Sequence, residues 1–74
     1  MTELEKCEYF LQKSGYVKDD DESDYLSFHK KGFPSVDINE DEIVFINDTG
    51  DFLTLPLNYD KLVNILIKFK YSID

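Results

Sequence analysis

The segment from Val36 to Leu55 constrains the fold most, because three short apolar strands alternate there with two polar turns. The second turn, with the sequence NDTGD, contains Gly50, which readily adopts the left-handed conformation that closes a three-residue hairpin loop. With residues 48–50 in that loop, Phe45 is predicted to pair with Leu53. The same register pairs Asn47 with Asp51, Ile46 with Phe52, Val44 with Thr54 and Ile43 with Leu55.

The first turn of this segment, residues 39–42, predicts the same core face. A four-residue hairpin loop there places Ile38 opposite Ile43 and Val36 opposite Phe45. Because side chains alternate across a strand, a one-residue slip in either turn would move every apolar side chain to the other face. The two turns therefore agree on one apolar face, formed by Val36, Ile38, Ile43, Phe45, Leu53 and Leu55.

The opposite face of the predicted sheet is too apolar for a purely solvated surface. It carries Asp37, Val44, Ile46, Phe52 and Thr54, with Tyr25 on the neighbouring surface. If both helices cover the other face, nothing else in the chain covers this one, so we predict a contact surface made of Tyr25, Val44, Ile46 and Phe52. A symmetric homodimer is the first interpretation, because twofold dimers are the commonest assembly. The alternative is that one helix crosses to this side or that flanking polar residues dilute the patch.

Two helices are predicted to flank the strands. The first, residues 2–14, begins with a capping box of Thr2 and Glu5 and ends before Gly15, and its apolar stripe contains Leu4, Cys7, Phe10 and Leu11. A strand is predicted from Tyr25 to His29. The second helix follows Asn58, a favourable N-cap. Its apolar positions at helical spacing are Leu62, Val63, Ile65, Leu66, Phe69 and Ile73.

The predicted order is helix, four strands, helix, which indicates one two-layer α+β domain spanning residues 1–74. Because the connections are short, the strands are expected to form an antiparallel four-stranded meander, with both helices on one face. The predicted core contains Leu4, Cys7, Leu11, Leu26, Phe28, Val36, Ile38, Ile43, Phe45, Leu53, Leu55, Leu62, Ile65, Leu66 and Phe69.

The chain carries 16 carboxylate residues and eight lysines, for a formal charge of −8. This balance argues against direct binding to nucleic acid and against binding to an anionic membrane, since both favour basic surfaces. It leaves open two interpretations, a basic partner protein or simple solubility. The predicted acidic partner surface contains Asp19, Asp20, Asp21, Glu22 and Asp24 from one loop and Glu40, Asp41 and Glu42 from a turn.

No pattern in the chain predicts a catalytic, cofactor or metal site. A calcium loop beginning at Asp19 needs glycine at position 24 and glutamate at position 30, but the chain has Asp24 and Lys30 there. Cys7 lies on an apolar helical stripe and is interpreted as a buried small hydrophobe. His29 stands alone at a strand end, without a partner motif. We therefore expect a protein that is not an enzyme and binds no cofactor.

Two functions are consistent with these observations. The first is a non-catalytic domain whose acidic surface binds a basic site on a nucleic-acid-binding protein, in the general manner of small acidic phage inhibitors. The second is a structural or housekeeping protein that forms a homodimer through its open sheet face. A single cysteine and the lack of an apolar run or targeting motif favour the cytoplasm. Residues with AT-rich codons indicate a bacterial or phage genome.

Overall fold

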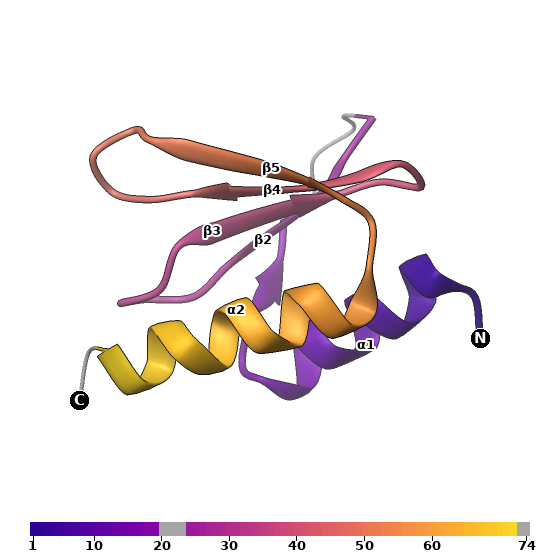
Figure 1. The fold of residues 1–74 in the computed structure, drawn as a ribbon, viewed down its shortest axis with the longest axis horizontal. Coiled ribbons are helices and arrows are strands. Elements are labelled where there is room, and N and C mark those ends of the chain that lie inside the picture. Colours follow the sequence, from indigo (N-terminus) through magenta and orange to yellow (C-terminus); the bar gives the residue numbers. More distant parts are fainter. Residues whose placement is uncertain (20–23, 73–74) are drawn as a thin grey trace.

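The computed structural model describes residues 1–19 and 24–72, with side chains up to Lys68. Two helices flank a five-stranded antiparallel sheet in an α+β arrangement (Figure 1). The elements are α1 (Glu3–Lys13), β1 (Val17–Lys18), β2 (Leu26–His29), β3 (Ser35–Ile38), β4 (Glu42–Ile46), β5 (Phe52–Pro56) and α2 (Tyr59–Ser72). The strands lie side by side in chain order, from β1 at one edge to β5 at the other.

The predicted register of β3, β4 and β5 is confirmed. Val36 lies opposite Phe45, and Phe45 lies opposite Leu53. The β4–β5 turn closes as expected, with Gly50 at a φ of 88° and the Asn47 N–H donating to the Asp51 carbonyl at 3.0 Å. In the β3–β4 turn, the Asn39 side-chain oxygen accepts hydrogen bonds from two backbone N–H groups, each at 2.8 Å. Local turn chemistry thus sets the register on both sides of β4.

The prediction of four strands is wrong, because β1 adds a fifth. After α1, Gly15 adopts a φ of 94° and turns the chain, so that Val17 pairs with His29 and Lys18 with Phe28. Tyr16, directly before β1, is buried, and its hydroxyl donates to the Pro34 carbonyl at 2.9 Å. A strand of two residues is too short to show alternation, so only pairing with β2 defines it.

Both helix N-termini are capped by side chains. The predicted capping box is present, since the Glu5 N–H donates to the Thr2 hydroxyl and the Thr2 N–H donates to the Glu5 carboxylate. Hydrogen bonds from the backbone and the side chain of Thr2 to the Glu5 carboxylate lower the pKa of that carboxyl. At α2, Asn58 accepts from the backbone of the first turn, and the Glu3 carboxylate accepts from the Tyr59 N–H at 2.6 Å. Glu3 therefore ties the start of α1 to the start of α2.

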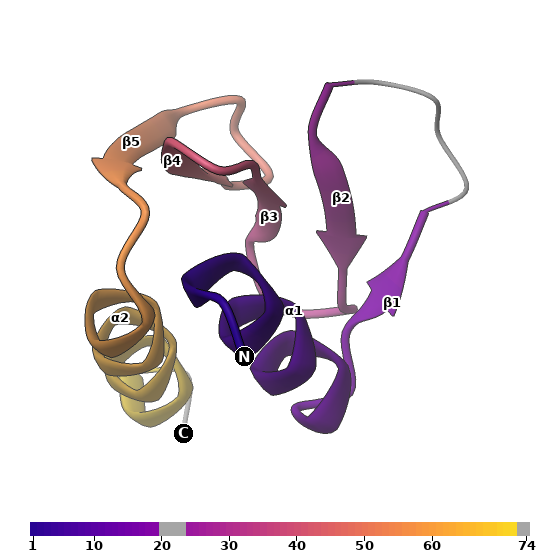
Figure 2. The ribbon, with the colours of Figure 1, turned by 90° about the vertical axis from the view of Figure 1, so that its right-hand side faces the viewer.

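Figures 1 and 2 show α1 and α2 on the same side of the sheet. The core between the two layers contains Cys7, Leu11, Tyr16, Phe28, Val36, Ile38, Ile43, Phe45, Leu62 and Leu66, all buried. Four other predicted core residues are partly buried against it: Leu4, Leu26, Leu55 and Ile65. The side chain of Phe69 lies outside the described residues.

The prediction that Leu53 belongs to the core is wrong, because half of its surface (50%) is exposed. It faces the core side of the sheet in the expected register, opposite buried Phe45. However, β5 is the edge strand, and Figure 1 shows α2 and the β4–β5 hairpin diverging toward the turn at residues 47–51. The correct face of a strand is therefore not sufficient for burial when the covering helix turns away.

Candidate functional site

The negative charge is concentrated on one continuous segment of the chain. Residues 32–60, which include β3, β4 and β5, contain seven carboxylates and no lysine or arginine, for a formal charge of −7. The other 45 residues contain nine carboxylates and eight lysines, for a charge of −1. The seven are Asp37, Glu40, Asp41, Glu42, Asp48, Asp51 and Asp60. Lysines therefore balance the rest of the chain but not this segment.

Part of the predicted acidic surface comes together around one hollow. Asp24, at the start of the segment leading into β2, and Glu40 and Asp41, in the β3–β4 turn, line a cavity of about 360 Å³. The turn lies at the end of the molecule where both helices begin (Figure 1). Glu3 and Glu40 line a neighbouring cavity of about 270 Å³. Two acidic segments distant in sequence thus share one surface.

Two other predicted acidic residues are engaged in internal contacts. Asp19 lies 2.9 Å from the Nδ1 atom of His29, and its backbone N–H donates to the Ser27 carbonyl. Glu42 accepts a hydrogen bond from the Tyr25 hydroxyl, which raises the pKa of that tyrosine. These carboxylates therefore hold strands and loops as well as contributing charge. Asp20, Asp21 and Glu22 lie outside the described residues.

The predicted apolar sheet face is limited to the β4–β5 hairpin. Val44 and Ile46 are half-buried on it, and Phe52 is 73% exposed. Across β1, β2 and β3, the row that contains Ile46 continues with Ser35, His29 and Val17. Of these, Val17 is an exposed apolar residue that the sequence did not place on this face. Tyr25, half-buried and bound to Glu42, lies at the other end of the face from Phe52. The structure therefore brings together Val44, Ile46 and Phe52 but not all four predicted residues.

The outer edge of β5 is a second surface, which the sequence reasoning missed. At the two ends of the hairpin, the Asn47 N–H donates to the Asp51 carbonyl and the Leu57 N–H donates to the Asp41 carbonyl. Backbone groups alternate in direction along an antiparallel strand, so Phe52, Thr54 and Pro56 direct theirs away from β4. A signal was present, because the last strand of a meander necessarily lies at an edge, and FLTLP carries no charge.

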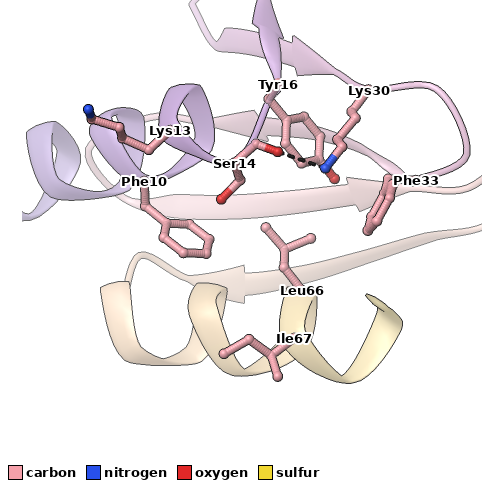
Figure 3. A pocket seen from close by; sticks show the side chains of 8 residues that line it. All are labelled: Phe10, Lys13, Ser14, Tyr16, Lys30, Phe33, Leu66 and Ile67. Atoms are coloured by element: carbon pink, nitrogen blue, oxygen red, sulfur yellow. Dashed lines mark hydrogen bonds between the residues drawn. The ribbon is translucent and has the colours of Figure 1, made fainter. Parts of the chain in front are cut away.

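Figure 3 shows a third hollow, of about 400 Å³, between the end of α1, the segment after β2 and α2. The Lys30 ammonium donates to the Ser14 carbonyl at 2.7 Å and lies 4.3 Å from the centre of the Phe33 ring. Lys13 points away from this hollow, toward the Tyr9 ring. The lysine inside the hollow thus stabilises the end of α1, and we interpret the hollow as part of the scaffold.

Cys7 is fully buried, and burial raises the pKa of its thiol to about 11. The thiol is therefore protonated near neutral pH, which makes it a poor nucleophile. Within residues 1–19 and 24–72, no three His, Cys, Asp or Glu side chains are grouped closely enough to hold a metal ion. In the same part of the chain, no helix has the length and apolar character required to cross a membrane.

Comparison of the chain with models of known families, with curated proteins and with solved structures finds no match.

Proposed function

We propose that this protein is a small, non-catalytic, acidic protein-binding domain of the bacterial or phage cytoplasm. In this proposal its acidic surface occupies a basic site on another protein, such as the phosphate-binding surface of a nucleic-acid-binding protein. The observation that carries the proposal is the segregation of charge, with −7 on residues 32–60 and −1 on the rest. The grouping of Asp24, Glu40 and Asp41 around one hollow supports it.

In this proposal the domain acts by occupying the basic site of its partner, and it catalyses no reaction. Lysine and arginine side chains that contact phosphates supply much of the affinity of a protein for nucleic acid. A rigid domain with clustered carboxylates attracts the same side chains, and complementary charge raises the rate of encounter. Bound in this way, the domain excludes the nucleic acid from that site. The exposed side chains of Glu40 and Asp41 have the freedom to make such contacts.

The test is capture of binding proteins from a bacterial lysate, followed by affinity measurement with each purified partner at about 50 mM and about 500 mM salt. We expect basic proteins that are released at the higher salt concentration. The variant E40Q/D41N should bind them about tenfold or more weakly. The matched control E5Q/E8Q removes two charges from α1, outside residues 32–60, and should have a smaller effect. Capture of no basic protein, or equal losses in both variants, contradicts the proposal.

The second candidate is a homodimer formed through the apolar sheet face. The specific observation in its favour is Phe52, which is 73% exposed beside Val44 and Ile46. Exposed apolar patches on small proteins commonly mark contacts between chains. In this alternative the negative charge serves solubility only. Sedimentation of the wild type and of Ile46→Lys separates the two candidates.

A further inference from the structure

The outer edge of β5 carries backbone N–H and carbonyl groups to which one more strand could hydrogen-bond. Phe52 and Thr54 each direct an N–H and a carbonyl away from β4, and Pro56 directs a carbonyl only, because proline has no N–H. Extended peptides bind to such edges by main-chain hydrogen bonds, and pockets beside the edge select their side chains. The five residues of β5 are long enough to pair with a short segment.

This edge lacks the features by which proteins commonly protect a terminal strand. Charged side chains, bulges and very short strands discourage further pairing. β5 contains no charged residue, and its single proline stands at the end of the strand. By contrast, the opposite edge strand, β1, has two residues, and its Lys18 forms an ion pair with Glu8 of α1 at 3.3 Å. Among the strands of the described residues, only β5 therefore has an edge that is open over several residues.

A hollow lies beside this edge on the core side of the sheet. It has a volume of about 270 Å³ and is lined by Pro34, Phe45, Asn47, Asp51, Phe52, Leu53 and Ile65. Leu53, half exposed, borders it because α2 diverges from the hairpin there. In an added strand, residues opposite Leu53 and Leu55 would direct their side chains to this side of the sheet. The hollow thus fits apolar side chains from alternate residues of a bound segment.

The charges around β5 favour a basic occupant over a second copy of the chain. Asp48 and Asp51 lie at the turn end of the strand, and Asp41, Glu42 and Asp60 lie at the Pro56 end. In an antiparallel pair of two copies, the turn end of one copy meets the Pro56 end of the other. Carboxylates then face carboxylates at both ends, which disfavours association. A basic segment meets opposite charge at both ends.

We propose that β5 binds an extended segment of a basic protein by strand addition, with alternate apolar side chains of that segment in the hollow beside Leu53. This inference rests on the proposed function, since it states which part of a basic partner the domain holds. The segment lies antiparallel to β5, so that the residues between the apolar ones hydrogen-bond to Phe52 and Thr54. Their side chains lie on the opposite face of the sheet, where basic groups are attracted by Glu42 and Asp37.

The probe is the synthetic peptide acetyl-Lys-Val-Lys-Val-Lys-Val-Lys-amide, titrated against the whole protein and followed by NMR and calorimetry. We expect slower hydrogen exchange at the Phe52 and Thr54 amides, by about tenfold or more at saturation, and smaller changes at Leu53 and Leu55, which already face β4. A peptide N-methylated at its lysines should lose binding, because those amides pair with β5. A peptide N-methylated at its valines should retain it. The opposite preference, or no preference, overturns the proposal.

Thr54→Pro tests the edge from the protein side. This change removes an N–H that makes no bond within the sheet, and proline is tolerated on an edge strand. We expect peptide affinity to fall about tenfold, while Thr54→Val, which retains the N–H, stays within about twofold. Both variants are compared with wild type by thermal melting, and Leu53→Asp, which changes the hollow but no backbone group, serves as a second blocking variant.

The outcomes separate this inference from the proposed function. Peptide binding that falls with salt and with E40Q/D41N, but not with Thr54→Pro or Leu53→Asp, overturns strand addition and leaves the acidic surface as the binding site. Self-association of the wild type that Thr54→Pro abolishes also overturns it, because the occupant is then a second copy. Loss of peptide binding in both blocking variants, with the α1 variant E5Q/E8Q unchanged, supports it even where the lysate contains no partner.

Discussion

The two edges of the sheet differ in length, charge and attachment, although both are antiparallel strands of the same small domain. β1 has two residues, bears an ion pair with α1 and follows the buried side chain of Tyr16. β5 has five residues, bears no charge and exposes Phe52 and Leu53. We infer that contacts with neighbouring elements protect a strand edge from pairing with a further strand. The β-propensity of the strand's own residues does not give this protection.

The largest expected effect on stability comes from comparing two phenylalanines of the β4–β5 hairpin, one buried and one exposed. Phe45→Ala removes a buried ring and should lower the free energy of unfolding by about 3–5 kcal/mol. Phe52→Ala removes a mostly exposed ring and should change it by less than about 1 kcal/mol. Urea unfolding of both variants measures the difference. Equal losses of unfolding free energy would mean that both faces of the hairpin are covered. In that case β5 would not be the exposed edge strand that the comparison requires.

The next effect concerns the closed edge. Tyr16→Phe keeps the buried ring but leaves the Pro34 carbonyl without its hydrogen bond, which should cost about 1–3 kcal/mol. The matched control is Tyr9→Phe, because Tyr9 is half exposed and should tolerate the loss of its hydroxyl. The same unfolding measurement applies. A cost no larger than that of Tyr9→Phe would show that this hydrogen bond does not secure the segment before β1.

The same tyrosine predicts a loss of stability at alkaline pH. Burial raises the pKa of Tyr16 from its ordinary 10 to about 12, so the unfolded chain releases this proton at lower pH than the folded chain does. Its contribution to stability is therefore constant below about pH 10 and falls as the pH rises toward 12, by up to about 1–3 kcal/mol. Buried Cys7 acts in the same direction between about pH 9 and 11.

Unfolding measured from pH 8 to pH 12 checks this dependence. Tyr16→Phe should show a shallower decline above pH 10 than the wild type, because its residue 16 does not titrate. Identical profiles for wild type and Tyr16→Phe would contradict the assigned burial of the Tyr16 hydroxyl.

Measurement of self-association tests whether the apolar sheet face forms a homodimer. If the face of Val44, Ile46 and Phe52 forms a homodimer, sedimentation of the wild type should show dimers at high concentration and Ile46→Lys should abolish them. Asn64→Lys places the same charge on an exposed position of α2 and should leave the dimer intact. A wild type that remains monomeric at high concentration excludes the dimer and leaves the acidic surface as the proposed site.

The smallest expected effect is at the ion pair of the closed edge. Glu8→Gln removes the partner of Lys18, but both side chains are partly exposed, so the loss should be below about 1 kcal/mol. It should shrink further when salt is added, because exposed charges are screened. A double-mutant cycle with Lys18→Met measures the coupling. A value above about 2 kcal/mol would show that charge, rather than strand length, closes this edge.

Much of the fold could be predicted because local chemistry decides it. Gly50 and Asn39 define two turns, and these set the register of β3, β4 and β5 without reference to distant residues. The capping box of Thr2 and Glu5 likewise needs only four neighbouring residues. Strand β1 could not be predicted, because two residues contain no period and their role arises only from pairing with β2.

Some properties of the candidate surfaces likewise follow from the sequence, and others follow only from the tertiary structure. The sequence by itself determined the total charge, its uneven distribution along the chain and the side of the sheet on which the side chains of β3, β4 and β5 lie. Only the tertiary structure decided that Asp24 lines the same hollow as Glu40 and Asp41, and that Leu53 is half exposed on the correct face. The physical reason is that alternation and turn geometry act over a few residues, whereas burial depends on the angle at which α2 crosses a sheet built from distant segments.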